Sequence, residues 1–301
     1  MTGIADFVDR SEFVPDAVLR ARLAQLSIVS RRSHGYSHTG SWRRRTSGSS
    51  LEVVDHRAYS PGDDYRHIDW NVYARTDALF VKVRESEETL VVHLLLDSSG
   101  SMESGCPSKF KIARAVVAAL GWRVLAGRDV LSATSLDIVL NSDFPSGQGY
   151  SHIGRFFDFM ARLRPSGETH LGQAVAAYNS RELAHGVAIL VSDLLTPDAT
   201  ESVGRLAQAG HELTVIHVLD ENFVAPVLAD EVQLVDAEGA GVIEIFGDEE
   251  LMRAYRQAVA RWIDQLRSFC HSRSVRYVPI MSEWSVEEIV LRRLRQHGVL
   301  W

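Results

Sequence analysis

The sequence predicts an α/β fold in which a doubly wound, mainly parallel sheet carries helices on both of its faces. Two observations predict this class. From residue 90 onward, short apolar runs typical of buried strands alternate with longer segments whose apolar residues recur at helical spacing. Such alternation indicates repeated strand–helix units, which form parallel sheets covered on both sides. The chain has 301 residues, of which 46% are hydrophobic, so it can bury one large core or two small ones.

Residues 1–88 do not share this alternation and are predicted to form a separate N-terminal region. Apolar side chains at helical spacing predict an amphipathic helix over residues 1–30. Residues 31–50 are rich in Arg, Ser, Gly and His and predict a loop. The arginine-rich stretch 31–45 within it is either a solvated basic surface or a docking patch for an acidic partner.

Residues 51–89 are extended in character. Residues 61–64 read Pro-Gly-Asp-Asp and predict a turn, because proline fixes φ and glycine permits positive φ. Residues 79–84 then alternate between apolar and polar side chains, as a half-buried strand does.

Residues 89–301 form the predicted sheet domain, and its elements follow from apolar periodicity and segment length. Strands are predicted at residues 90–96, 130–135, 137–141, 187–192, 212–219 and 275–280, with the second and third forming a hairpin. Helices are predicted at residues 108–126, 151–163, from just after Thr169 to about 184, 198–209, 248–271 and 285–297. Residues 231–247 are predicted to form a hairpin insertion in this domain.

The net charge and the cysteine content narrow the possible binding partners and the cellular compartment. The net charge of −7 does not favour general nucleic-acid binding. The two cysteines, Cys106 and Cys270, do not form a disulfide framework, so a reducing compartment is expected. The N-terminus lacks the pattern of a signal peptide, and no segment approaches the roughly 18 apolar residues of a membrane span. We therefore expect a soluble, cytoplasmic protein.

Oxygen-bearing side chains follow the predicted strand 90–96. Asp97, Ser99 and Ser101 occupy alternate positions directly after its apolar run. The carboxyl edge of a parallel sheet is where α/β folds place their chemistry. Carboxylate and hydroxyl oxygens suit a hard cation such as Mg2+ or Mn2+ better than zinc. The pattern therefore predicts a divalent metal site at the top of the sheet.

Two later positions fit the same site. Thr169 lies in a loop just before a predicted helix, and Asp193 ends the buried-type strand 187–192. The alternative interpretation is structural: Asp97 and Asp193 would only cap helices, and the serines would only form turns.

This order of residues resembles the metal-ion-dependent adhesion site of von Willebrand factor A domains. All five positions of that site are matched, by Asp97, Ser99, Ser101, Thr169 and Asp193. The resemblance implies a von Willebrand factor A-like, Rossmann-type sheet. It also implies that the serines bind the ion directly, the threonine directly or through water, and the aspartates usually through waters. One coordination position would then stay open for a Glu or Asp of a partner protein.

A second resemblance covers most of the chain, from about residue 20 to the end. The run Arg57-Ala-Tyr-Ser-Pro-Gly-Asp-Asp-Tyr-Arg-His-Ile-Asp-Trp70 is similar to the signature of domain-of-unknown-function family 58 (DUF58). Members of this bacterial family often occur with MoxR-type AAA+ ATPases. Many carry transmembrane helices, and this chain resembles the short soluble subgroup. The resemblance implies an adaptor or co-chaperone that passes force from such an ATPase to a client complex.

The signature has two physical interpretations. Its charged residues alternate in sign through a tight turn: Arg57, Asp63, Asp64, Arg66 and Asp69. They can form an ion-paired lock that ties the N-terminal region to the sheet, with Trp70 and Tyr59 packed beneath it. The same charges also suit a surface that faces a partner.

Enzyme classes match the sequence less well. Gly100 and Gly105 have the spacing of the two glycines of a P-loop, but Cys106 and Pro107 occupy the positions where that motif requires lysine and Ser/Thr. Ser99 replaces the second aspartate of an aspartyl-phosphate phosphatase, and no Gly-x-Ser-x-Gly elbow surrounds it. A metal-dependent hydrolase would need a general base, for which His170 is the candidate.

We therefore expect a metal-dependent protein–protein interaction module rather than an enzyme. Its expected cofactor is Mg2+ or Mn2+, and its expected partners are a MoxR-type AAA+ ATPase and a client that offers a Glu or Asp. Two alternatives stay open. One is an adhesion-like module that binds another acidic protein without an ATPase, and the other is a metal-dependent hydrolase.

Overall fold

The computed structural model describes residues 10–30, 44–46, 53–61, 63–86, 89–136, 142–165, 171–181, 183–226, 232–235, 242–245 and 249–301. The chain divides into two compact units. The sheet unit combines Met1–Val29 with Leu90–Trp301, and the inserted unit comprises Ser30–Thr89. This division differs from the predicted one, which joined residues 1–88, because the first 29 residues group with the sheet.

The sheet unit is built on six strands in the order β11-β8-β7-β4-β5-β6. The strands are β4 (Val91–Asp97), β5 (Val130–Leu136), β6 (Asp143–Gln148), β7 (Val187–Ser192), β8 (Glu212–Leu219) and β11 (Arg276–Met281). All neighbours pair in parallel except β5 and β6, which are antiparallel. Renumbered by chain order and read from the β6 edge, the sheet has the 3-2-1-4-5-6 order of a doubly wound fold. The predicted fold class is therefore confirmed.

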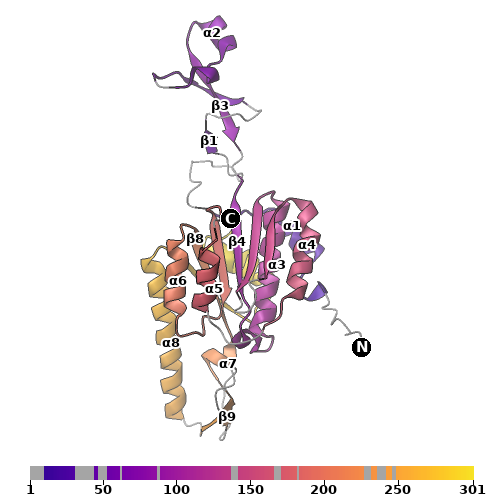
Figure 1. Ribbon diagram of the computed structural model, residues 1–301, viewed down its shortest axis with the longest axis vertical. Coiled ribbons are helices and arrows are strands. Elements are labelled where there is room, and N and C mark those ends of the chain that lie inside the picture. Colours follow the sequence, from indigo (N-terminus) through magenta and orange to yellow (C-terminus); the bar gives the residue numbers. More distant parts are fainter. Residues whose placement is uncertain are drawn as a thin grey trace. The chain divides into compact units, whose positions relative to one another are not determined.

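Helices cover both faces of this sheet (Figure 1), and an apolar core lies under each layer. One layer contains α1 (Ala17–Leu23), α3 (Lys109–Ala126), α4 (Ile153–Arg162) and a C-terminal segment of α9 (Val286–Glu288), a π-helical turn (Ile289–Arg293) and α10 (Leu294–Gln296). The other contains α5 (Leu171–Asn179), α6 (Ala199–Gln208) and α8 (Glu249–Ser272). In the part of the chain that the structure describes, no helix is both long and apolar enough to cross a membrane.

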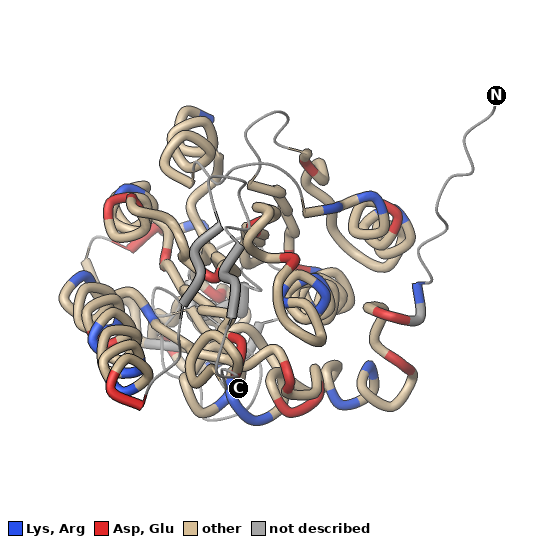
Figure 2. The backbone as a smooth tube through the Cα atoms, turned by 90° about the horizontal axis from the view of Figure 1, so that it is seen from below, with Lys and Arg blue, Asp and Glu red and all other residues tan. Residues whose placement is uncertain are grey.

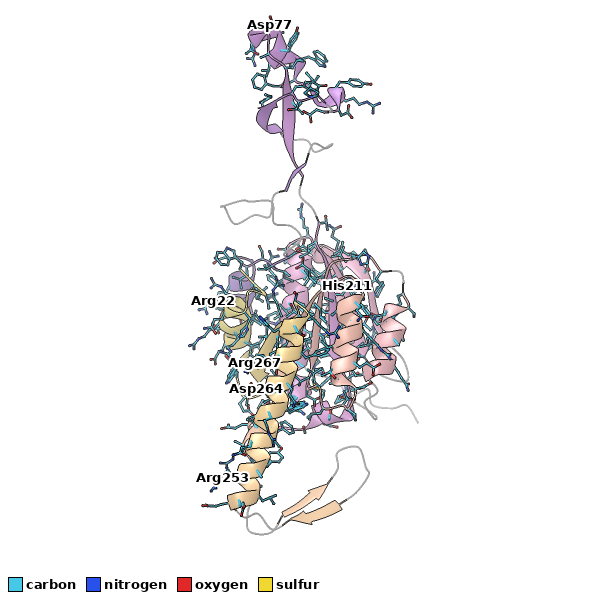
Figure 3. The ribbon with its side chains drawn as sticks, turned by 90° about the vertical axis from the view of Figure 1, so that its left-hand side faces the viewer. Arg22, Asp77, His211, Arg253, Asp264 and Arg267 are labelled. Carbon is cyan, nitrogen blue, oxygen red and sulfur yellow. The ribbon has the colours of Figure 1, made fainter. Side chains whose placement is uncertain are left out.

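The helix α8 is packed mainly through its second half. Its buried residues are Val259, Leu266 and Cys270. Figure 3 labels Arg253 near the opposite end, which extends away from the sheet. The short helix α7 (Glu221–Val224) and the antiparallel hairpin of β9 (Val232–Val235) and β10 (Val242–Ile245) precede α8, and this hairpin falls within the predicted insertion.

The segment after α1 joins the C-terminus of the chain. Ser27 N–H donates to the Trp301 carbonyl at 2.9 Å, and Trp301 N–H donates to the Ser27 carbonyl at 3.0 Å. Asp16 begins α1 by accepting a hydrogen bond from Leu19 N–H at 2.7 Å. The predicted helix over residues 1–30 is thus too long, because the chain after α1 turns to make this backbone pairing.

Two further elements differ from the predictions. The partner of β5 is β6, which begins later than the predicted strand at 137–141; that range lies outside the described residues. The sequence of β6, Asp-Phe-Pro-Ser-Gly-Gln, lacks the apolar alternation that marks a strand. In the inserted unit, α2 (Trp70–Thr76) was expected to be extended. It has no buried residue, so it carries no apolar periodicity to detect.

The inserted unit contains an antiparallel sheet in the order β1-β3-β2. Its strands are β1 (Arg44–Thr46), β2 (Val53–Ala58) and β3 (Phe80–Ser86). The strand β1 lies where a loop was expected, because a three-residue arginine-containing strand has no apolar pattern.

The acidic residues of the signature act as local caps in the inserted unit. Asp63 accepts a hydrogen bond from Ser60 N–H at 2.9 Å. Asp69 lies 2.8 Å from His56 Nε2, and it also caps α2 by accepting hydrogen bonds from backbone N–H groups. Trp70 is 58% exposed, so the expectation that it packs beneath these charges is wrong.

Candidate metal centre

The predicted site lies where the connections of the sheet diverge. After β4 the chain passes through α3 to β5, and after β7 it passes through α6 to β8 on the other side. Doubly wound sheets bind ligands at this switch point, outside the carboxyl ends of the strands. Asp97 ends β4, and Asp193 directly follows β7. Figure 2 views the unit from the side on which these strands end, and acidic positions lie near the centre of that view.

The Asp97 carboxylate is 1% exposed, and both of its oxygens accept hydrogen bonds. Oδ1 accepts from Ser99 N–H at 2.9 Å, and Oδ2 accepts from Ser192 Oγ at 2.5 Å. Burial, and after it the nearby charge of Asp193, raise the pKa of Asp97 to about 6, although these hydrogen bonds partly offset both effects. The two carboxylates are therefore close enough for their charges to interact.

The serine hydroxyls lie next to each other on the loop after β4. Ser99 Oγ and Ser101 Oγ are 3.1 Å apart, and both residues are buried. A 3-10 turn (Gly100–Glu103) holds this spacing. Two adjacent ligands of an octahedral ion at 2.0–2.1 Å lie roughly 3 Å apart, so this pair has the spacing that Mg2+ requires.

The second carboxylate, Asp193, is paired with a buried lysine. Lys109 Nζ lies 2.5 Å from Asp193 Oδ2, and each side chain is 2% exposed. Oδ1 of the same carboxylate accepts a hydrogen bond from Leu195 N–H at 3.1 Å. Sequence analysis missed Lys109. The sequence signal that could have indicated Lys109 is its place at the start of a mostly apolar segment, which forms the nearly fully buried helix α3.

A histidine beneath the site supports the backbone of Asp193. His217 Nε2 lies 2.8 Å from the Asp193 carbonyl, and His217 Nδ1 lies 2.5 Å from Tyr277 Oη. Because a carbonyl only accepts, Nε2 carries the proton and the tyrosine hydroxyl donates to Nδ1. Burial lowers the pKa of His217 to about 4, so the ring is neutral at physiological pH and both ring nitrogens are engaged.

A third carboxylate, Asp220, lies at the same edge of the sheet and was also missed. It follows β8, is 4% exposed and caps α7 by accepting from Asn222 N–H at 2.6 Å. Its Oδ2 would lie 2.3 Å from a side-chain carbon added at Gly105, where φ is +96°. The loop that follows Ser101 therefore runs directly against Asp220, and only glycine fits there without a shift.

Four of the five predicted ligands are described: Asp97, Ser99, Ser101 and Asp193. Thr169 lies outside the described residues, as does His170, the candidate base. Among the described residues, no group of three His, Cys, Asp or Glu side chains could hold a metal. An ion at this site would therefore depend on the serine hydroxyls, and an all-oxygen donor set fits Mg2+ or Mn2+.

Comparison with known proteins gives a family match over most of the chain. A family model described as "Protein of unknown function DUF58" matches residues 55–263. An uncharacterized protein of Mycobacterium tuberculosis is 30% identical over 264 residues, which is 83% of this chain and 83% of that protein. An uncharacterized protein of Mycobacterium bovis matches with the same identity and coverage.

Solved structures give looser matches. The conserved hypothetical protein BatB of Bacteroides thetaiotaomicron is 16% identical, with a TM-score of 0.41 over 69% of this chain and 98% of that one. The manganese-loaded TRAP protein of Plasmodium vivax is 21% identical, with a TM-score of 0.29 over 43% of this chain and 57% of that one.

Proposed function

Because this chain belongs to the DUF58 family, and because its sheet carries two carboxylates and two adjacent serine hydroxyls at one edge, we propose that it is a metal-dependent protein-interaction module. The observation that carries the proposal is the 3.1 Å separation of Ser99 Oγ and Ser101 Oγ beside the buried Asp97. The two hydroxyls are hydrogen-bonded to each other at this separation, which is also the spacing of adjacent metal ligands.

Five side chains take part in the proposed metal site. Ser99 and Ser101 hold Mg2+ or Mn2+ directly, and Thr169 completes the protein donors as the family resemblance implies. Asp97 and Asp193 supply negative charge and accept hydrogen bonds from the waters of the ion. When bound, the ion supplies an open position for a carboxylate oxygen from a partner protein.

We propose a binding role rather than a catalytic one. A hydrolase needs a general base near the ion. Among the described residues, His217 is the histidine beside Asp193, and its ring nitrogens already contact the Asp193 carbonyl and the Tyr277 hydroxyl. It is therefore unable to take a proton from a metal-bound water without breaking these contacts.

The proposed partner is a MoxR-type AAA+ ATPase, and the proposed role is that of an adaptor or co-chaperone that links the ATPase to a client. This part of the proposal is supported by the family signature at residues 57–70. We also propose that the protein acts in the cytoplasm, where such an ATPase would reach it.

Calorimetric titration with Mn2+ tests the proposal. The double variant Ser99→Ala with Ser101→Ala should lose Mn2+ binding while it keeps its fold. The matched control is Ser98→Ala, because this neighbouring buried hydroxyl bonds to Ser135 Oγ at 2.7 Å instead. Unchanged Mn2+ affinity in the double variant would refute a metal site at these serines.

A further inference from the structure

A buried ion pair already engages the second carboxylate of the proposed site. The ammonium of Lys109 lies 2.5 Å from Asp193 Oδ2, at 2% exposure of both side chains. The other oxygen of Asp193 accepts the backbone N–H of Leu195. One oxygen is therefore held by the protein backbone, and the one that remains for an ion or its waters is held by a lysine.

The charges at this edge of the sheet explain why an ammonium is present. Asp97 and Asp193 are both almost fully buried, and two like charges that are removed from water repel each other strongly. The ammonium of Lys109 neutralises one of these two charges. Among Asp97, Asp193 and Lys109, a divalent ion added beside the ammonium would leave one net positive charge. The same ion without the ammonium would balance the charges of Asp97 and Asp193.

We propose, on the basis of the metal-binding function proposed above, that Lys109 is a built-in competitor of the divalent ion: its ammonium holds Asp193 in the metal-free protein and leaves Asp193 when the ion binds. The lysine side chain is an unbranched stem with several rotatable bonds, so its head can move while α3 stays in place. The competition sets the ion concentration at which the site fills.

The position of Lys109 also links this exchange to the serine loop. Lys109 N–H donates to the Ser104 carbonyl at 2.9 Å, and Ser104 N–H donates to the Ser101 carbonyl at 3.3 Å. The residue that carries the competing ammonium is thus connected through the backbone to the turn that presents Ser101. Filling of the site by an ion and movement of the Lys109 head away from Asp193 are therefore two sides of one equilibrium.

The first test measures Mn2+ affinity of the wild type, Lys109→Met and Lys111→Met. Lys111 lies on the same helix, is 46% exposed and pairs with Glu12 at 3.5 Å, so it is a matched control for the loss of one positive charge. Lys109→Met should bind Mn2+ about tenfold more tightly or better, because the ion no longer has to displace an ammonium from Asp193. Lys111→Met should stay within about twofold of the wild type, because water and salt screen its charge.

The second test uses the wild type alone, so that it holds even if Lys109→Met fails to fold. Lysines are labelled with an amine-reactive reagent, with and without saturating Mn2+, and the labelled peptides are identified by mass spectrometry. Labelling of Lys109 should rise several-fold with Mn2+, and labelling of Lys111 should not change. If Mn2+ binds and Lys109 labelling stays the same, the displacement is refuted.

The outcomes separate this inference from the proposed function. Tighter binding by Lys109→Met supports the competition, as does binding by this variant when the wild type binds no Mn2+. Equal affinity of the wild type and a folded Lys109→Met overturns the competition and leaves the metal site standing. Absence of binding in both proteins overturns both proposals, since no ion would then exist for the lysine to exclude.

Discussion

Ser192 Oγ donates a 2.5 Å hydrogen bond to Asp97 Oδ2, and this bond joins the ends of the two central strands of the sheet. Ser192 Oγ also accepts a hydrogen bond from the N–H of Leu194 at 2.9 Å, and Leu194 adopts a φ of +54°. One hydroxyl therefore fixes both the first carboxylate of the proposed site and the turn on which Asp193 lies.

Ser192→Ala should destabilise the protein and weaken Mn2+ binding. The change leaves one oxygen of a buried carboxylate unsatisfied, which costs about 1.5–3 kcal/mol of unfolding free energy. Urea unfolding and Mn2+ calorimetry measure the two effects. Ser202→Ala is the control, because Ser202 is fully buried and its hydroxyl has no hydrogen-bond partner among the described residues. Equal losses of stability in both variants would contradict the role given to Ser192.

Asp97 and His217 should make the stability of the metal-free protein depend on pH in opposite directions. The pKa of Asp97 is raised from 3.8 to about 6, so the folded protein holds this proton more tightly than the unfolded chain. Its contribution is present below pH 3.8 and is lost as the pH rises through about 6. The pKa of His217 is lowered from 6.5 to about 4, so its contribution is present above pH 6.5 and is lost as the pH falls toward 4.

Single variants should unmask the two trends. In EDTA, Asp97→Asn should gain stability as the pH rises from about 4.5 to about 6.5, because Asp97 no longer opposes the His217 contribution. His217→Gln should lose stability over the same range. Urea unfolding at several pH values measures both slopes. Identical slopes in the two variants would show that these groups do not control the pH dependence.

Leu23→Ala should lower the stability of the sheet unit by about 2–5 kcal/mol, because a fully buried leucine leaves a cavity. Leu23 is 0% exposed in the core beneath α1. Val18 lies on the same helix and is 61% exposed, so Val18→Ala should change stability by less than about 0.5 kcal/mol. Denaturant unfolding of the full chain compares them. A small effect at Leu23 would mean that the first residues are not part of the sheet unit.

Asp69→Ala and Trp70→Ala separate the two interpretations of the family signature. Asp69 caps α2 and lies 2.8 Å from His56 Nε2, so its loss should cost about 0.5–2 kcal/mol. Trp70 is largely exposed, and its loss should leave stability unchanged while it weakens partner binding. Thermal unfolding and a pulldown measure these effects. If Trp70→Ala unfolds the protein and Asp69→Ala does not, the surface interpretation fails.

Binding of the proposed ATPase or client should require the divalent ion. Affinity measured in Mg2+ should fall at least about tenfold in EDTA, because the partner carboxylate loses the ion that it contacts. Thr169→Ala should weaken binding in Mg2+ and have no effect in EDTA. Equal affinity in both buffers, with the fold intact, would move the interaction surface away from the site, and the arginine-rich stretch 31–45 would be the next surface to test.

The sheet was predictable because burial on both faces forces strands such as β4 and β7 to be apolar throughout. The lengths of these apolar runs, and the helical periodicity of the segments between them, left few alternative assignments of strand and helix. Elements without an apolar pattern gave no such signal: α2 depends on the Asp69 cap, and the sequence of β6 is mostly polar although Phe144 is buried. The N-terminal helix was predicted too long because Ser27–Val29 pairs with the far end of the chain, which no local pattern reveals.

The carboxylates and serines of the site were predictable because each follows an apolar strand within a few residues. Their supporting residues were not. Lys109, His217 and Ser192 contact the site from three different elements, and each lies inside a segment that its apolar neighbours identify only as helix or strand. Their roles arise from tertiary contacts, so a pattern read along the chain passes over them.

The pairing of Ser27 with Trp301 also constrains how the chain matures during translation. The helix α1 is made early, yet the surfaces that cover Leu19 and Leu23 belong to segments made much later, including α3. The partner α3 is therefore absent from the nascent chain while the inserted unit and β4 are being synthesised. The hydrogen bonds between Ser27 and Trp301 can form only after Trp301 has left the ribosome, so this pairing joins segments that are synthesised far apart in time.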